Sequence, residues 1–181
     1  MAFNTPSTVS TGGTATAALW NTSVRDNINF LVDPPMCQAQ RASNQTITSA
    51  SSTAIAMTGD VFDTDTMHDP TTNNTRITCN TAGVYLFTGT IQFDANSSGV
   101  RYLQLWLNGT TDIADVGSTS TSATNLTKLS IAFPWQMAVN DYMEMRAYQT
   151  SGGGLIVLGV TAGNPGPGPC YFGAQWVGTG T

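Results

Sequence analysis

Two neighbouring segments with alternating side chains constrain the fold of this chain more than any other feature. In residues 81–93, aliphatic and threonine side chains alternate with aromatic residues and glycine, and residues 101–109 follow the same period of two. This period is that of a β-strand whose two faces differ. The second segment ends in Asn108-Gly109, the strongest short signal for a hairpin turn. The two segments therefore predict a pair of long strands in an antiparallel sheet.

Further short strands are expected along the rest of the chain, separated by turn residues. We expect them at residues 36–42, 45–49, 53–57, 75–79, 112–116, 125–137, 142–150, 155–160 and 170–177. Polar or Gly/Pro-rich loops are expected between them at residues 59–74, 117–124 and 163–169. Many short strands with regular turns predict an all-β fold, either a sandwich or a jelly roll.

The composition excludes several classes of partner. The chain has 181 residues, which suits one domain with a short extension. Only 9% of them are charged, far below the roughly 25% of typical globular proteins. The five arginines and the single lysine, Lys128, are scattered along the chain, so we expect no nucleic-acid partner. We see no signal peptide and no long apolar run, so we expect no membrane partner either.

An N-terminal segment, residues 1–35, is expected to lie outside the β domain of residues 36–181. Residues 1–13 predict an extended arm, and a helix capped by Thr14 or Thr16 follows. Asp33-Pro34-Pro35 ends that helix. Apolar residues at helical spacing form one side of it, here called the helix stripe: Trp20, Val24, Ile28 and Leu31. A single short stripe does not reveal its partner, which could be its own domain, sister helices or another surface.

The β domain contains a series of short landmarks in a characteristic order. They are Arg41-Ala42, Phe62-Asp63-Thr64-Asp65, Gly83-Val84-Tyr85, Arg101 with Asn108-Gly109, Asn140-Asp141-Tyr142 and Tyr171-Phe172-Gly173-Ala174. Together they resemble the C1q/TNF-like jelly-roll superfamily over residues 36–178. The resemblance implies a trimeric binding or structural module and argues against an enzyme. Asn140 stands where the family usually has glycine, and asparagine also tolerates a left-handed turn.

The same resemblance implies candidates for a trimer interface. In this family, three protomers pack through flat aromatic faces of the sheets. The aromatic residues that could serve here are Tyr85, Phe87, Tyr102, Trp106, Phe133, Trp135 and Phe172. Because side chains alternate along a strand, only some of them can face a neighbour, and the others fill the core.

The N-terminal segment carries a second resemblance. Residues 18–31 are similar to a short segment of structural proteins of bacteriophages, especially those of actinobacteria. We therefore expect a homotrimeric virion protein, assembled in the host cytoplasm, with the major capsid protein or a tail protein as its partner. Our preferred function is capsid decoration, with the helix stripe as the attachment site. The alternative is a tail-associated head that binds a host surface glycan.

One polar loop invites a metal or catalytic interpretation. His68, the single histidine, lies among Asp60, Asp63, Asp65 and Asp69. Clustered carboxylates suit Ca²⁺, but the spacing lacks the glycine and closing glutamate of an EF-hand loop. No Gly-x-Ser-x-Gly motif accompanies the histidine. We therefore expect a hydrogen-bonded surface loop with no metal, no cofactor and no catalytic residue.

The three cysteines are Cys37, Cys79 and Cys170. The family resemblance makes the first and last strands neighbours, so a disulfide between Cys37 and Cys170 is geometrically possible. Reduced, buried thiols are the favoured interpretation for a particle assembled in the cytosol. Cys79 is expected in the core.

Overall fold

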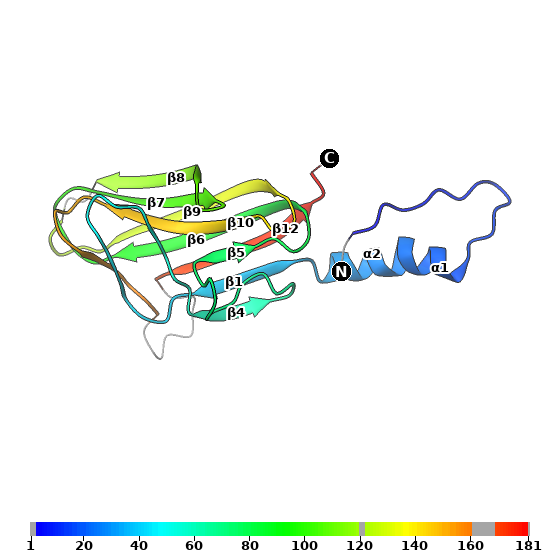
Figure 1. The fold of residues 1–181 in the computed structure, drawn as a ribbon, viewed down its shortest axis with the longest axis horizontal. Helices are drawn as coiled ribbons and strands as arrows, with labels where there is room; N and C mark the ends of the chain where they lie inside the picture. The colour runs from blue at the N-terminus through cyan, green and yellow to red at the C-terminus, as the bar shows by residue number, and fades with distance from the viewer. Residues whose placement is uncertain (1–2, 120–121, 161–168, 181) are drawn as a thin grey trace.

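The computed structural model describes residues 3–119, 122–160 and 169–180. Within them, a helical segment precedes two antiparallel β-sheets that face each other, and this segment projects from one end of the sheets (Figure 1). The all-β jelly-roll fold predicted from the sequence is therefore confirmed. Its two layers arise because most strands have one apolar face, which is buried only when a second sheet covers it.

The larger sheet, called sheet A, has seven strands in the order β2-β11-β6-β12-β1-β4, and β9 lies along β6 as well. Strand β6 lies between β9 and β12, and it pairs with β9 over its whole length. The strands are β1 (Met36–Gln40), β2 (Gln45–Ile47), β4 (Gly59–Asp63), β6 (Gly83–Phe93), β9 (Thr127–Met137), β11 (Leu155–Val157) and β12 (Tyr171–Gly178).

The smaller sheet, sheet B, has five strands in the order β3-β10-β7-β8, with β5 pairing to β10. Its strands are β3 (Thr53–Ala54), β5 (Arg76–Thr78), β7 (Val100–Leu107), β8 (Thr111–Thr119) and β10 (Tyr142–Gln149). Two predicted turns are confirmed here. Asn108 and Gly109 both have positive φ in the β7–β8 hairpin, and Asn140 has a φ of 73° before β10.

Two predicted loops were partly wrong. The polar loop expected at residues 59–74 contains β4, which pairs with β1 across a register shift. Strand β4 was missed from the sequence because it is short, contains two carboxylates and shows little apolar periodicity. The loop expected at residues 117–124 begins later, because β8 continues to Thr119. Most of the loop expected at residues 163–169 lies outside the described residues.

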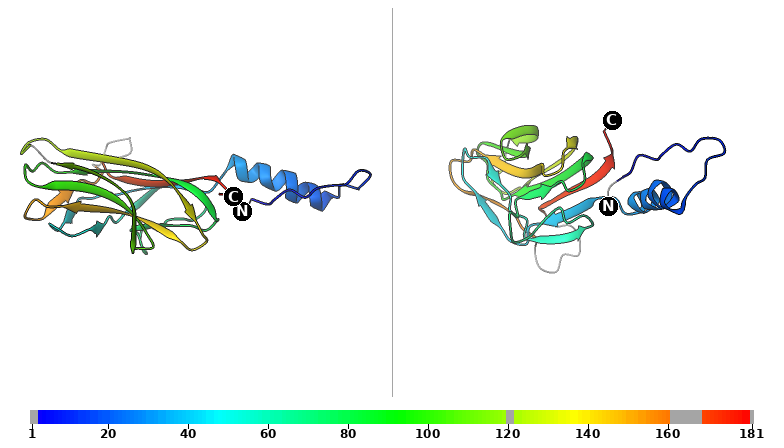
Figure 2. Two further views of the ribbon diagram at one scale, coloured as in Figure 1. Left: turned by 90° about the horizontal axis from the view of Figure 1, so that it is seen from above. Right: turned by 45° about the vertical axis from the view of Figure 1, so that its right-hand side comes forward.

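The N-terminal segment forms a helix and an arm. Helix α1 (Ala17–Trp20), the π-helical turn η1 (Asn21–Arg25) and helix α2 (Asp26–Val32) run on continuously. Thr16 caps the start, where its hydroxyl accepts a hydrogen bond from the Leu19 amide at 3.2 Å. The arm before it doubles back along the helix (Figure 2). Hydrogen bonds from Asn4 to Asn27 and from Ser7 to Ser23 hold it there.

An aromatic cluster joins this projection to the β domain. Phe30, at the end of α2, is only 2% exposed and meets Trp176 of β12 edge to face, with ring centroids 4.7 Å apart. Phe3 of the arm lies against both rings. The Trp176 amide also donates to the Pro35 carbonyl at 2.8 Å. The arm, the helix and the last strand therefore share one small core.

Candidate interaction surfaces

The predicted interface aromatics fall into three groups. Tyr85, Phe87 and Phe172 are at most 1% exposed and lie between the sheets. These three candidates therefore fill the core, as was expected for part of the set, and they drop out of the candidate interface because the protomer itself encloses them. Strand parity is the cause: the odd-numbered residues of β6 point into the core, and the even-numbered ones point outwards.

The remaining candidates are partly exposed. Phe133 and Trp135 of β9 stack on each other with centroids 6.2 Å apart and pack against the edge of the core. Tyr102 covers Gly117 on the neighbouring strand, where a β-carbon would lie only 2.4 Å from its ring. The Arg146 guanidinium covers the Trp106 ring at 4.4 Å. Tyr102 and Trp106 therefore form part of a polar-aromatic layer on the outside of sheet B.

The outer face of sheet A was not predicted as a surface. It is formed by the residues of β9, β6, β12 and β1 that alternate with the core positions. Among the described residues of these four strands, the outward side chains are uncharged except that of Lys128. They are mostly small or amide side chains: Met36, Gln38 and Gln40; Val84, Leu86, Thr88, Thr90 and Gln92; Ser130, Ala132, Pro134 and Gln136; Tyr171, Gly173, Gln175 and Val177.

A shallow hollow of about 110 Å³ lies in the middle of this face. It forms over Gly173, which has no side chain, and Leu86, Thr88 and Gln38 border it. Phe62 of β4 stands at its rim and is 44% exposed. The face therefore combines mostly uncharged side chains with a cavity into which a side chain can insert. The alternation of small even-numbered residues in β6 is the sequence signal that could have revealed it.

The helix stripe does not pack under its own domain. Trp20, Ile28 and Leu31 are 60%, 54% and 61% exposed, and Val32 beside them is 79% exposed. Val24 is half-buried. The apolar side of the projection is therefore open to another molecule, which excludes one of the three partners considered from the sequence.

The polar loop around His68 is held by its own hydrogen bonds. His68 Nδ1 lies 2.6 Å from Asp60 Oδ1, and Nε2 lies 3.3 Å from the Asn74 carbonyl oxygen. The Asp63 carboxylate accepts from the amides of Asp65, Met67 and His68. Since both ring nitrogens are occupied and no hydroxyl bonds them, the described residues provide no catalytic triad here.

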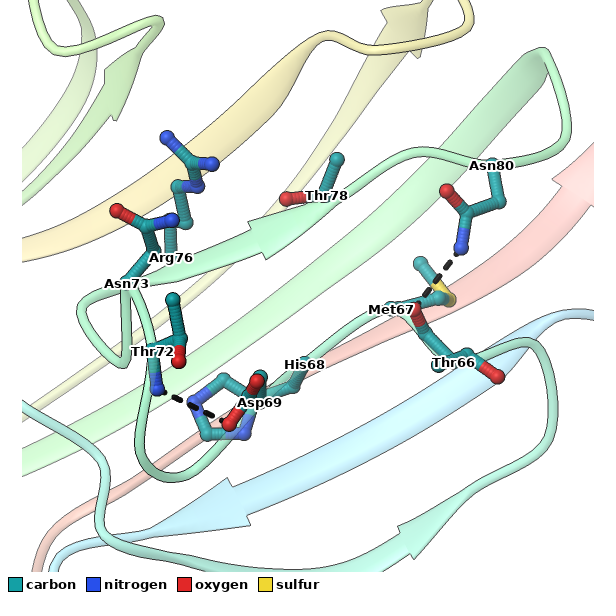
Figure 3. Close-up of a pocket in the computed structure, with 9 residues that line it drawn as sticks. All are labelled: Thr66, Met67, His68, Asp69, Thr72, Asn73, Arg76, Thr78 and Asn80. Atoms are coloured by element: carbon teal, nitrogen blue, oxygen red, sulfur yellow. Dashed lines mark hydrogen bonds between the residues drawn. The ribbon is translucent and has the colours of Figure 1, made fainter.

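A polar cleft of about 260 Å³ opens between this loop and β5 (Figure 3). Its walls include His68, Asp69, Arg76 and Asn80. The Thr71 hydroxyl and the Thr72 and Thr71 amides donate to Asp69, and they lower the pKa of its carboxyl to about 2. No group of three or more histidine, cysteine, aspartate or glutamate side chains suited to a metal ion occurs in the described part of the chain. The cleft offers hydroxyl, amide and guanidinium groups to a polar ligand.

The three thiols are free and buried. Cys37 pairs in register with Ala174, whereas the Cys170 carbonyl accepts from the Arg41 amide. The two cysteines thus lie four residues apart along β12, about 13 Å at the rise of a strand. A disulfide needs Cα atoms within about 7 Å, so Cys37 and Cys170 are not a pair.

We expect the thiols to resist modification in the native protein. Burial raises the pKa of Cys170 to about 12 and raises the pKa values of Cys37 and Cys79 as well. The reactive thiolate is therefore scarce at pH 8. A disulfide-exchange reagent that absorbs on reaction should detect no thiol in the folded chain and three after denaturant is added. Fewer than three in the denatured, unreduced chain would contradict the assignment.

No helix among the described residues has the length and apolar character needed to cross a membrane.

Comparison with known proteins defines the fold class. No protein-family model and no curated protein matches the sequence. Solved structures that are similar include Eiger TNF from S. frugiperda, at 13% identity and a TM-score of 0.57, covering 81% of this chain and 96% of that one. The globular domain of zebrafish complement 1qA protein is 12% identical with a TM-score of 0.54, and the match covers 79% of this chain and 97% of that one. Murine APRIL is 10% identical with a TM-score of 0.57, and the match covers 79% of this chain and 98% of that one. The β domain therefore has the C1q/TNF jelly-roll fold.

Proposed function

We propose that this protein is a non-enzymatic homotrimer whose jelly-roll heads associate through the outer face of sheet A. The neutrality of that face is the observation that carries the proposal. Burying an unpaired charge against a partner is costly, and this face has one charged side chain, Lys128, among the outward residues of its four central strands. It can therefore be buried against a partner without the cost of unpaired charges, provided that its amide and hydroxyl groups find hydrogen-bond partners.

A cyclic trimer also needs a second, different surface on each copy, because its interfaces join unlike patches. Phe133 and Trp135 lie on β9, which pairs with β6 at one side of sheet A. The rings pack against the edge of the core, and their exposed edges are the surface that we assign to meet the hollow over Gly173 of the next copy. The likeness of the fold to C1q/TNF domains supports three as the number of copies.

We further propose that the trimer decorates a phage capsid, with the major capsid protein as its partner on the virion surface. The phage assignment starts from the expectation that the sequence of residues 18–31 raised. One structural observation supports it: residues 3–32 project from the head as a preformed arm and helix (Figure 2). A compact head on such a projection suits attachment to a particle, where bridging of adjacent subunits would stabilise the shell by mass action.

The second candidate function is glycan recognition by a tail-associated head. The cleft beside His68 favours it, because hydroxyl, amide and guanidinium groups line a space of about 260 Å³. A sugar ring would find hydrogen-bond partners there.

The number of copies per purified virion distinguishes the two functions. Quantitative mass spectrometry should find copies in proportion to the major capsid protein if the trimer decorates the capsid. A handful of copies would point to the tail and to the glycan-binding cleft. Complete absence from purified virions would reject both roles.

A further inference from the structure

The exposed side of the helix is one straight apolar stripe. In a regular α-helix, residues four apart rotate by about 40° at each step, so Val32 would point about 120° away from Trp20. The π-turn Asn21–Arg25 has more residues per turn than an α-helix, so each residue rotates less, and the angle between Trp20 and Val32 is smaller than in a regular helix. Trp20, Ile28 and Leu31 of the helix stripe are 60%, 54% and 61% exposed, Val32 beside them is 79% exposed, and Val24 lies between Trp20 and Ile28.

No segment within residues 3–119, 122–160 and 169–180 covers this stripe. The arm occupies a different face, where Asn4 bonds Asn27 at 2.7 and 2.9 Å and the Ser7 amide donates to Ser23 at 3.4 Å. The β domain contacts the helix only near its C-terminal end, where Phe30 packs on Trp176, and the rest of the helix extends beyond the sheets (Figures 1 and 2). Since the described residues leave the stripe exposed, we look for its partner in another molecule.

We propose that the occupant is the same stripe of sister copies, so that the helices form a parallel bundle that continues the head trimer. The distribution of charge is compatible with this partner. In a parallel bundle each residue lies opposite the same residue of the other copies, and the stripe contains no charged residue that would repel its own copy. Arg25 and Asp26, the two charged residues of the helix, neutralise each other at 2.9 Å beside the stripe.

The position of the stripe fits as well. Leu31 and Val32 are exposed and come shortly before Pro35, whose carbonyl accepts from the Trp176 amide at 2.8 Å. Val177, the next residue of β12, is 53% exposed and belongs to the outer face of sheet A. The end of the stripe is therefore tied to the strand that carries the face proposed to join the heads. Once the heads are joined, the helices meet at an effective concentration of about millimolar, at which even a weak helix contact forms.

This inference rests on the proposed trimer, and a cross-linking experiment separates the two. In full-length chains, Ile28→Cys introduces a thiol into the stripe, and Asn29→Cys introduces one at the exposed neighbouring position outside it. The native thiols are buried and do not compete. Under mild oxidation at micromolar chain concentration, Ile28→Cys chains should link between copies several times faster than Asn29→Cys chains. Both thiols share the effective concentration that the joined heads provide, but only residue 28 faces its own copy across the bundle.

The native mass of the unmodified chain is measured in parallel. Trimers in which Ile28→Cys links no faster than Asn29→Cys would overturn the bundle and leave the head trimer intact; the stripe would then be free to bind a virion partner. A monomeric native mass would overturn the trimer and the bundle with it.

Discussion

Replacing Arg101 by alanine should lower the free energy of unfolding by about 3–5 kcal/mol, because it leaves a cavity and unpaired carbonyls. Arg101 is 0% exposed. Its Nη1 donates to the carbonyls of Ser98 and Val100, both at 2.9 Å, and Nη2 donates to that of Asn96 at 3.4 Å. These bonds fix the loop between β6 and β7. Urea unfolding followed by tryptophan fluorescence measures the change.

Arg76→Ala is the matched control for this variant. The Arg76 guanidinium lies over the Tyr142 ring at 4.6 Å at the mouth of the cleft. A partly exposed contact of this kind contributes about 0.5–1 kcal/mol. If Arg101→Ala destabilises the chain no more than Arg76→Ala does, Arg101 is not the clamp of the β6–β7 loop that its hydrogen bonds indicate.

Replacing Thr88 by arginine should separate the trimer into folded monomers. Thr88 faces outwards at the centre of sheet A, opposite Gly173 on one side and Ala132 on the other. A guanidinium there would be buried in every interface without an anionic partner. An unpaired charge in such a position costs several kcal/mol, so the dissociation constant should rise about a hundredfold or more. Sedimentation of serial dilutions measures it.

Ser51→Arg adds the same charge on an exposed turn and should leave the assembly unchanged. The circular dichroism and the unfolding midpoint of Thr88→Arg should stay close to those of the unmodified chain, because Thr88 contributes little to the core. A Thr88→Arg chain that assembles like Ser51→Arg would place the interface elsewhere than on the outer face of sheet A.

The strands could be predicted where apolar and polar side chains alternate strongly, and they could not be predicted where this alternation is weak. Strands β6 and β7 were evident because large apolar residues recur at every second position. Strand β4 was missed because Asp60 and Asp63 serve the loop through His68 and backbone amides. Those hydrogen bonds replace the apolar signal that a strand normally has in its sequence.

The interaction surfaces could be predicted only in part. Bulky aromatic residues suggested an interface, yet Tyr85 and Phe87 are core residues and the outward positions between them hold Leu86 and Thr88. Which parity faces outwards depends on the second sheet, and the size alternation along β6 is the one local indication of it. The helix stripe could be proposed from the spacing of its apolar residues, but its exposure depends on where the arm docks, on Ser23 and Asn27, which is a tertiary contact.

The native mass of the purified, full-length chain tests the central claim most directly. Equilibrium sedimentation should give a trimer of about 57 kDa, three times the 19.0 kDa of the chain. That mass should persist on dilution into the micromolar range and dissociate in the Thr88→Arg variant. A stable monomer of 19.0 kDa at all concentrations would contradict self-association through the outer face of sheet A.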